Sequence, residues 1–233
     1  MGRLSGQTVV VTGASRGIGR ACALALAAEG AQVALVARGL EGLQAAVGEI
    51  QSGGGRALAI AGDVADEALA AAVFEKVERE LGPVSVLVND AAILELGRVA
   101  ELSTEAFDRT LDVNLRGPFL FAREAVRRML PRKRGRIVFV SSISSTLGTP
   151  RASAYNASKW ALNGLLKSLA EELKGTGVLA LGVSPGSVDT EMLAKSGFPP
   201  AMQPEDVAVV VRFLATEAPP AMQGSIVEMF GDQ

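Results

Sequence analysis

The fold can be inferred from a stretch near the start of the chain, Thr8-Val9-Val10-Val11-Thr12-Gly13-Ala14-Ser15-Arg16-Gly17-Ile18-Gly19. Its β-branched beginning predicts a buried strand, and an Ala/Leu-rich run with helical spacing follows over residues 17–29. Glycines between a strand and a helix allow a tight turn and a close approach to a pyrophosphate, whose charge the helix N-terminus meets. The spacing Gly-x-x-x-Gly-x-Gly differs from the commoner dinucleotide fingerprint, so an ordinary glycine-rich loop stays open as an alternative.

The same alternation of short apolar runs and longer helical stretches continues to the end of the chain. Further strands are predicted at 32–36, 58–61, 84–88, 136–140, 178–183 and 225–229, and further helices at 41–51, 67–81, 104–129, 155–174 and 206–215. The strands are apolar on both faces, which is typical of a parallel sheet between layers of helices. We therefore predict one α/β domain over residues 1–233, a Rossmann fold with a doubly wound, mostly parallel seven-stranded sheet and helices on both faces.

The composition excludes several classes of protein. The chain is 48% hydrophobic and 21% charged, which suits a sizeable core, and its net charge of −2 argues against a nucleic-acid partner. It has no histidine and a single cysteine, Cys22, which excludes Ser-His-Asp hydrolysis, disulfides and His- or multi-Cys-ligated metals. We see no secretory leader and no apolar run of bilayer length. We therefore expect a soluble cytoplasmic protein with no metal and no membrane partner.

The end of the second predicted strand indicates which dinucleotide is bound. In NAD enzymes of this architecture an acidic side chain after this strand holds the ribose hydroxyls. Here Ala37 stands in that place and Arg38 follows it. A 2′-phosphate would meet a guanidinium and no carboxylate there, and Arg16 in the glycine turn is a second cation. We expect NADP(H) rather than NAD(H); the alternative is that both arginines are solvated surface groups.

A candidate acid–base pair lies at the start of the helix predicted over residues 155–174. Tyr155 is the only tyrosine of the chain, and Lys159 follows one turn later on the same helix face. A nearby ammonium should lower the phenol's pKa from about 10 and make it usable at neutral pH. Ser142 closes the fifth predicted strand, 13 residues before Tyr155. Taken singly, these residues are ambiguous, since Tyr-x-x-x-Lys is common on helix surfaces and a serine after a strand can be a turn hydroxyl.

In this order the motifs, from Thr12 to Thr190, resemble those of the short-chain dehydrogenase/reductase superfamily. The resemblance implies four catalytic residues. Ser142 would hydrogen-bond the substrate carbonyl, Tyr155 would be the acid and base, Lys159 would hold the nicotinamide ribose, and Asn114 would fix a helix kink and a water. It also implies that the cofactor is held by Gly13, Ser15, Arg16, Gly17, Ile18, Gly19, Arg38, Asp63, Val64, Asn89, Ala91, Tyr155, Lys159, Pro185, Gly186, Val188 and Thr190.

The loop after the fourth predicted strand departs from the family's usual motif. After the fourth strand the family commonly shows Asn-Asn-Ala-Gly, whereas this chain has Asn89-Asp90-Ala91-Ala92. Ala92 adds a methyl group where glycine is usual, which would change the pose or affinity of the cofactor if the backbone there requires glycine. A plain helix N-cap is the competing role for Asp63 or nearby Asp66. The segment at about 191–203 is predicted to be a short substrate lid.

The resemblance implies an oxidoreductase that transfers hydride between nicotinamide and a ketone or secondary alcohol. A carbonyl reductase is the main prediction. A 3-oxoacyl-[acyl-carrier-protein] reductase is the alternative, for which the basic run over residues 127–136 would offer an acidic carrier protein a docking site. A cofactor-binding regulator without turnover is a third reading. Family members assemble through the helices that bear Asn114 and Tyr155, so a homodimer or homotetramer is expected.

Overall fold

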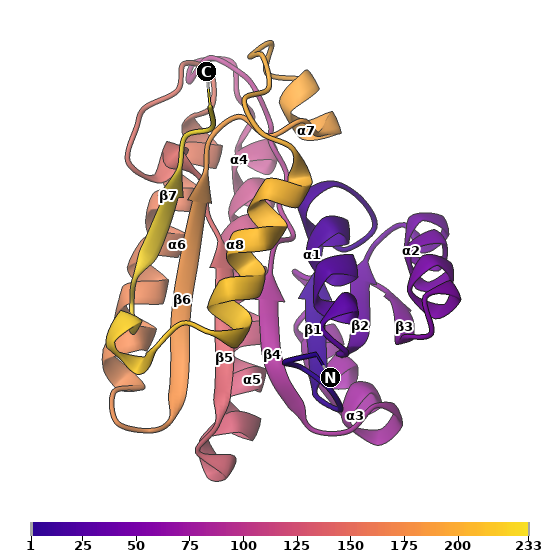
Figure 1. Cartoon of the computed structure of the whole chain (residues 1–233). Helices are drawn as coiled ribbons and strands as arrows, with labels where there is room; N and C mark the ends of the chain where they lie inside the picture. Colours follow the sequence, from indigo (N-terminus) through magenta and orange to yellow (C-terminus); the bar gives the residue numbers. More distant parts are fainter. Residues whose placement is uncertain (1, 233) are drawn as a thin grey trace.

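Seven strands form one sheet in the order β3-β2-β1-β4-β5-β6-β7 (Figure 1). The computed structural model describes residues 2–232. Every neighbouring pair of strands is parallel, which confirms the predicted fold. The strands are β1 (Thr8–Thr12), β2 (Gln32–Ala37), β3 (Arg56–Ala61), β4 (Val84–Asn89), β5 (Gly135–Val140), β6 (Val178–Pro185) and β7 (Ile226–Met229).

Helices cover both faces of the sheet, because successive side chains of each strand point to opposite sides. In β1, Val9 and Val11 pack in one apolar cluster and Val10 in the other. The first cluster includes side chains of α1 (Gly17–Ala28), α2 (Leu40–Ser52) and α8 (Pro204–Thr216). The second includes side chains of α3 (Glu67–Glu80), α5 (Gly117–Arg132) and α6 (Ser153–Glu172). The shorter pieces are α4 (Thr104–Leu111), α7 (Glu191–Ala194), η2 (Ile143–Ser145) and η3 (Pro220–Met222).

The strand order changes direction at β1, which lies between β2 and β4. The first three strands run outward on one side and the last four on the other, so the loops after β1 and β4 diverge at the carboxyl edge of the sheet. Ligands of open α/β sheets bind in the crevice that such a divergence leaves. In Figure 1 this edge is at the top of the view, where α7 also lies.

The helix predicted over residues 104–129 is interrupted, which corrects that prediction. It consists of α4, a π-helical segment η1 (Asp112–Arg116) and α5. Pro118 has no backbone N–H, so the carbonyl of Asn114 loses the donor that a regular α-helix would supply four residues later. The chain forms a wider, π-helical turn at residues 112–116, where this hydrogen bond is missing. The turn contains the candidate catalytic residue Asn114.

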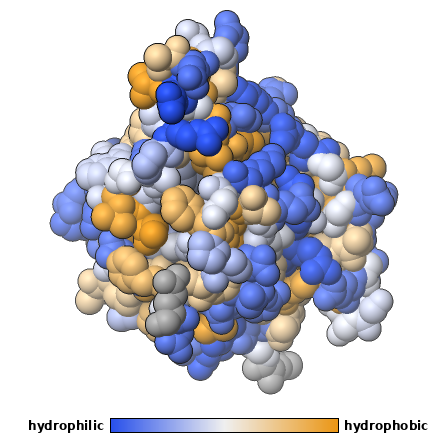
Figure 2. All heavy atoms as spheres, turned by 90° about the horizontal axis from the view of Figure 1, so that it is seen from above, coloured by the Kyte–Doolittle hydropathy of each residue, from blue (hydrophilic) through white to orange (hydrophobic). Residues whose placement is uncertain are grey.

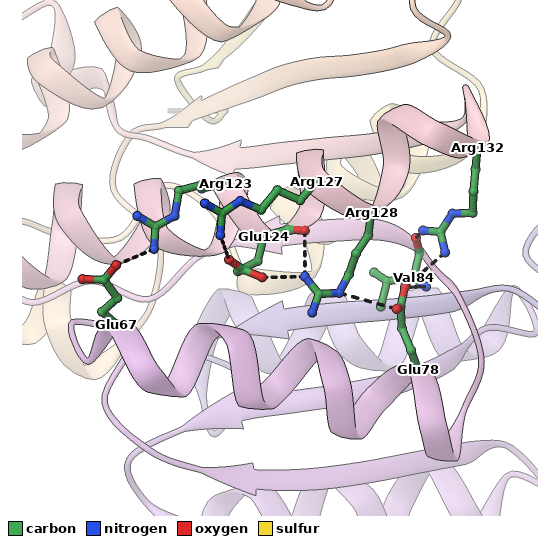
Figure 3. Close-up of polar contacts among 8 residues, drawn as sticks. All are labelled: Glu67, Glu78, Val84, Arg123, Glu124, Arg127, Arg128 and Arg132. Atoms are coloured by element: carbon green, nitrogen blue, oxygen red, sulfur yellow. Dashed lines mark hydrogen bonds and ion pairs between the residues drawn. The ribbon is translucent and has the colours of Figure 1, made fainter.

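Most arginines of the basic run bind acceptors within the protein (Figure 3). Glu124 on α5 is only 4% exposed, and its carboxylate accepts hydrogen bonds from Arg127 at 2.8 Å and Arg128 at 2.5 Å. Arg128 and Arg132 also pair with Glu78 on α3. A buried carboxylate without such cations would be costly, so this network fastens α5 to α3. No helix within residues 2–232 combines the length and the apolar character needed to cross a membrane.

Candidate active site

A cavity of about 590 Å³ follows the carboxyl edge of the sheet at the switch point. Five successive strands each lead into a residue that lines it, which are Gly13, Arg38, Asp63, Asp90 and Ser141. Figure 2 looks onto this edge from above and shows apolar side chains interspersed with hydrophilic ones. The topology therefore gathers residues that are distant in sequence into one crevice.

Most of the predicted site residues line this cavity. They are Gly13, Ser15, Arg16, Gly17, Ile18, Arg38, Asp63, Val64, Ala91, Tyr155, Lys159 and Thr190. The other predicted site residues are not among those that line the cavity. They are Gly19, Asn89, Asn114, Ser142, Pro185, Gly186 and Val188.

Three predicted site residues outside the lining have contacts of their own. Asn89 is 2% exposed, and its Nδ2 lies 3.5 Å from the carbonyl oxygen of Pro118. The N–H of Gly186 donates to the carbonyl of Met229 at 2.8 Å, which joins the end of β6 to β7. Val188 is buried and bridges to Met202, so it anchors the returning end of the segment 191–203. These three residues shape the crevice from outside.

Two positions of the glycine turn have no room for a side chain. Gly13 has φ +72°, and a methyl group on it would lie 2.8 Å from the amide nitrogen of Ala91. On Gly19 it would lie 2.5 Å from the carbonyl oxygen of Gly13. The Thr12 hydroxyl accepts the N–H groups of Asp90 and Ala91 at 3.1 and 3.2 Å, which fastens this turn to the end of β4. A bare backbone cradle at the start of α1 fits a pyrophosphate.

The opposite end of the cavity carries the residues expected to select the dinucleotide. Ala37 ends β2 and Arg38 follows it into the lining, where no ion-pair partner for Arg38 occurs among residues 2–232. Arg16 instead forms an ion pair with Glu191 on α7. Burial raises the pKa of Asp63, but the Ala65 amide and the Arg109 guanidinium together lower it by more than burial raises it. The pKa of Asp63 is therefore below its ordinary value, and its carboxylate is ionised. Arg38 is thus the cation most available to a 2′-phosphate.

Tyr155 and Lys159 project from the first turns of α6 into the same crevice. The Lys159 Nζ lies 5.7 Å from the centroid of the Tyr155 ring and donates to the carbonyl of Val140 at 2.9 Å. Lys159 is 2% exposed. Ser142, at the end of β5, accepts the N–H of Ser144 at 3.1 Å. The loop after β5 and the start of α6 therefore bring the predicted hydroxyl, phenol and ammonium together.

The prediction that the lysine lowers the phenol's pKa is wrong in this arrangement, because burial dominates. Burial raises the pKa of Tyr155 to about 12, the neighbouring Ser142 hydroxyl lowers it, and the charge of Asp90 raises it. Burial also lowers the pKa of Lys159 to about 8, against the attraction of Asp90. The phenol is therefore protonated at neutral pH, the state that a proton donor requires.

Asn114 lies in the π-helical segment and is fully buried. Its Oδ1 accepts the N–H of Ile93 at 2.8 Å, and its Nδ2 donates to the Ile93 carbonyl at 2.9 Å and to Ser158 Oγ at 3.1 Å. Ser158 Oγ in turn donates to the carbonyl of Tyr155 at 2.6 Å. The predicted helix kink is present. The asparagine therefore holds the loop after β4 against the helix that carries Tyr155.

The sequence assigns no role in the site to Asp90, which stands there only as a departure from the family's usual motif. In the structure Asp90 lines the cavity together with Ala92 and Ser141. The signal that could have found Asp90 was its place directly after a central strand, since residues there face the crevice. Among residues 2–232, no three His, Cys, Asp or Glu side chains are grouped so that they could hold a metal ion.

Known proteins are similar in sequence to this chain over most of its length. The family described as short chain dehydrogenase matches residues 7–198. A short chain dehydrogenase of Pseudocercospora fijiensis is 42% identical over 194 residues, which are 82% of this chain and 62% of that protein. A 3-oxoacyl-[acyl-carrier-protein] reductase of Synechocystis is 35% identical over 227 residues, 93% of this chain and 92% of that protein.

A solved structure shares the fold as well. It is that of a Beutenbergia cavernae protein provisionally assigned as an NAD(P)-dependent gluconate 5-dehydrogenase, with NADP bound at low occupancy. The two chains are 36% identical and superpose with a TM-score of 0.90, over 98% of this chain and 96% of the other.

Proposed function

This chain belongs to the short-chain dehydrogenase family and is an oxidoreductase, and we propose that it is an NADP(H)-dependent carbonyl reductase. One observation carries the proposal. The Ser142 hydroxyl hydrogen-bonds to the protonated Tyr155 phenol, which lines the same crevice as a glycine turn suited to a pyrophosphate. That pairing suits the reduction of a C=O bond, which needs a hydride donor, a hydrogen bond to the carbonyl oxygen and a proton.

NADP(H) is the proposed cofactor because of the residues around the ribose end of the crevice. Arg38 offers a guanidinium, and Ala37 leaves out the carboxylate that would repel a 2′-phosphate. The glycine cradle would hold the pyrophosphate, and Lys159 and Thr190 would hold the nicotinamide half. The NADP in the Beutenbergia cavernae structure supports this choice.

In the proposed reaction the bound nicotinamide supplies the hydride, and the chain's own residues supply the rest. Ser142 donates a hydrogen bond to the substrate oxygen and fixes the carbonyl. Tyr155 gives that oxygen its proton and takes one back in the reverse direction. Lys159 lies within 5.7 Å of the phenol ring and stabilises the phenolate that proton transfer leaves. Asn114 acts on this group only by holding the first turns of α6.

The proposed substrate is an apolar ketone. Ala92, Ile93 and Met192 line the crevice beside the phenol's helix, and the segment at about 191–203 would cover the bound substrate as a lid. The Arg16–Glu191 ion pair already ties that segment to the glycine turn. An apolar wall with a few polar groups is typical of small-molecule sites.

A 3-oxoacyl-[acyl-carrier-protein] reductase is the second candidate, favoured by the Synechocystis relative. A carrier protein would need free cations near the crevice. Arg136 donates to the backbone carbonyls of Leu214 and Ala218. With the arginine network on α5, this leaves Lys133 and Arg134 as the cations of the basic run whose side chains bind no acceptor in the described part of the chain. Both lie next to the start of β5, at the edge opposite to the crevice. We therefore place this candidate second.

We also propose that the protein is a homo-oligomer. Phe119 on α5 and Trp160 on α6 are 44% and 55% exposed, on the two helices through which the family assembles. Large apolar side chains exposed on adjacent helices suit an interface between copies. Light scattering on the purified chain would give its mass directly.

A substrate panel tests the proposed function. Apolar ketones, 3-oxoacyl thioesters and quinones are each mixed with NADPH, and turnover is followed at the nicotinamide absorbance. The proposal expects the ketones to be reduced fastest. Preference for the thioesters would establish the second candidate, and NADPH binding without any turnover would indicate a regulator.

Replacing Ser142 by alanine is expected to lower kcat for ketone reduction by about 10²-fold, since one preorganised donor to the reacting oxygen is lost. Thr146→Ala is the matched control. Thr146 is exposed, its hydroxyl donates to the carbonyl of Ile143 and it does not line the crevice, so its loss should change kcat less than about 3-fold. Steady-state kinetics of both variants check this. Equal losses in the two variants would show that Ser142 has no special role.

A further inference from the structure

Asp90 occupies the space between the glycine turn and the acid–base pair. Its Oδ2 lies 3.0 Å from where a methyl group on Gly13 would stand and 2.7 Å from the same point on Gly19. Its own N–H is fixed by Thr12 at 3.1 Å. The carboxyl group is thus held directly against the backbone that would cradle a pyrophosphate, and it lines the same crevice as Tyr155 and Lys159.

Burial affects the pKa of Asp90 more than the charges around it do. Burial raises its pKa to about 7, although the Lys159 ammonium and the Gly19 amide both lower it. From α6 it faces Lys159 and Tyr155, and from α1 it faces the Cys22 thiol, whose pKa burial raises well above its usual range. The other charged groups of the crevice lie on its rim and are Arg16, Arg20, Arg38, Asp63, Asp189, Glu191 and Glu205. Of the groups that touch Asp90, only Lys159 offers it a positive charge.

An asparagine at this place, as is common in the family, could not change its charge. An aspartate can, and the change occurs beside the site of the most negative part of a dinucleotide. An ionised carboxylate would repel the pyrophosphate across a poorly solvated gap, whereas a protonated one would not. The glycine turn can therefore bind a pyrophosphate when Asp90 is protonated, and repulsion weakens this binding when Asp90 is ionised.

We propose that Asp90 takes up a proton when a dinucleotide binds, so that this protein couples its affinity for the cofactor to pH. The inference rests on the proposed function, because it assumes that the crevice receives a dinucleotide. The sign follows from linkage: the complex holds more protons than the free protein, so affinity is highest at low pH. It falls as pH rises above about 7, by up to about tenfold per pH unit, until Asp90 ionises in the complex as well.

Proton uptake can be measured without any turnover. NADPH is titrated into the full-length protein by calorimetry, in buffers of different ionisation enthalpy, from pH 6 to pH 8.5. The dependence of the observed heat on buffer gives the number of protons taken up. The wild type should take up about half a proton near pH 7, where Asp90 is half ionised before binding. Asp90→Asn has nearly the same shape and should take up fewer than about 0.1 protons at that pH.

Lys159 is the competing source of protons within the crevice, because its pKa of about 8 also lies within the range. The 2′-phosphate of NADPH, with a second pKa of about 6, contributes alike to the wild type and to Asp90→Asn. Lys159→Met separates the two groups. Without the ammonium, the pKa of Asp90 rises, so the uptake maximum should move to higher pH in this variant. If Lys159 itself were the source, the maximum would vanish in Lys159→Met and persist in Asp90→Asn, and the inference would be overturned.

The remaining outcomes are distinct. Wild-type protein that binds NADPH with no proton uptake at any pH contradicts the role of Asp90 and leaves the proposed function standing. Wild-type protein that binds neither NADPH nor NADH between pH 6 and pH 8.5 contradicts the proposed function itself. If Asp90→Asn does not fold, Lys159→Met still separates the two groups: an uptake maximum that moves to higher pH supports Asp90, and one that vanishes overturns the inference.

Discussion

Tyr155→Phe is expected to lower kcat for ketone reduction by about 10⁴-fold while the dissociation constant for NADPH changes by less than about twofold. The phenol is protonated at neutral pH and forms a hydrogen bond with the Ser142 hydroxyl. The chain has no histidine and no other tyrosine to replace it. Phenylalanine keeps the ring that packs beside Lys159, so the cavity should keep its shape.

The two quantities are measured separately, by steady-state kinetics and by the fluorescence of bound NADPH. Lys159→Met serves as the contrasting variant, since it should weaken both binding and turnover. A Tyr155→Phe enzyme that retained more than about a tenth of the wild-type kcat would show that the proton comes from elsewhere. Asp90 would then be the nearest other acid in the crevice.

The double variant Ala37→Asp, Arg38→Ala is expected to lower the preference for NADPH over NADH by about 10³-fold. Loss of the guanidinium removes a charge-assisted bond to the 2′-phosphate, and the new carboxylate repels that phosphate while it accepts from the ribose hydroxyls. Ala37 ends β2 and lines the crevice, so an aspartate there has room to face the ligand. The measurement is kcat/KM for each cofactor at one saturating ketone concentration.

Arg134→Ala is the matched control, because it removes an exposed arginine at the other edge of the sheet and should leave the preference unchanged. A wild-type enzyme that already favours NADH tenfold would refute the reasoning from Ala37 and Arg38. A double variant that loses both cofactors equally would show that this end of the crevice supports binding without selecting between them.

The sheet was predictable because its signals are local. Runs such as Val84–Val88 and Val178–Val183 are apolar on both faces, which only a strand covered on each side satisfies. The π-helical break was not predictable from periodicity, since Asp112 to Arg116 keep a pattern that suits a regular helix. Its cause is the missing N–H of Pro118, a backbone effect that side-chain hydrophobicity does not record.

The positions of the site residues could be predicted where a sequence motif specifies them. Their pKa values could not, because burial determines them. The positions of Tyr155 and Lys159 followed from helical spacing, and the structure places both in the crevice. The direction of the phenol's pKa did not follow, because desolvation depends on everything packed around it. Asp90 shows the same limit, since its proximity to Gly13 and Gly19 arises only when β4 lies next to β1.

The π-helical turn between α4 and α5 also affects which sequence changes this protein can accept. Such a turn holds one residue more than the α-helix around it, so removing one residue from 112–116 would close the wider turn. Everything on one side would then rotate by about 100° about the axis relative to the other. Asn114 would leave Ile93 and Ser158, and the amphipathic face of α4 would turn toward water. Evolution can therefore replace residues within this turn far more easily than it can shorten it.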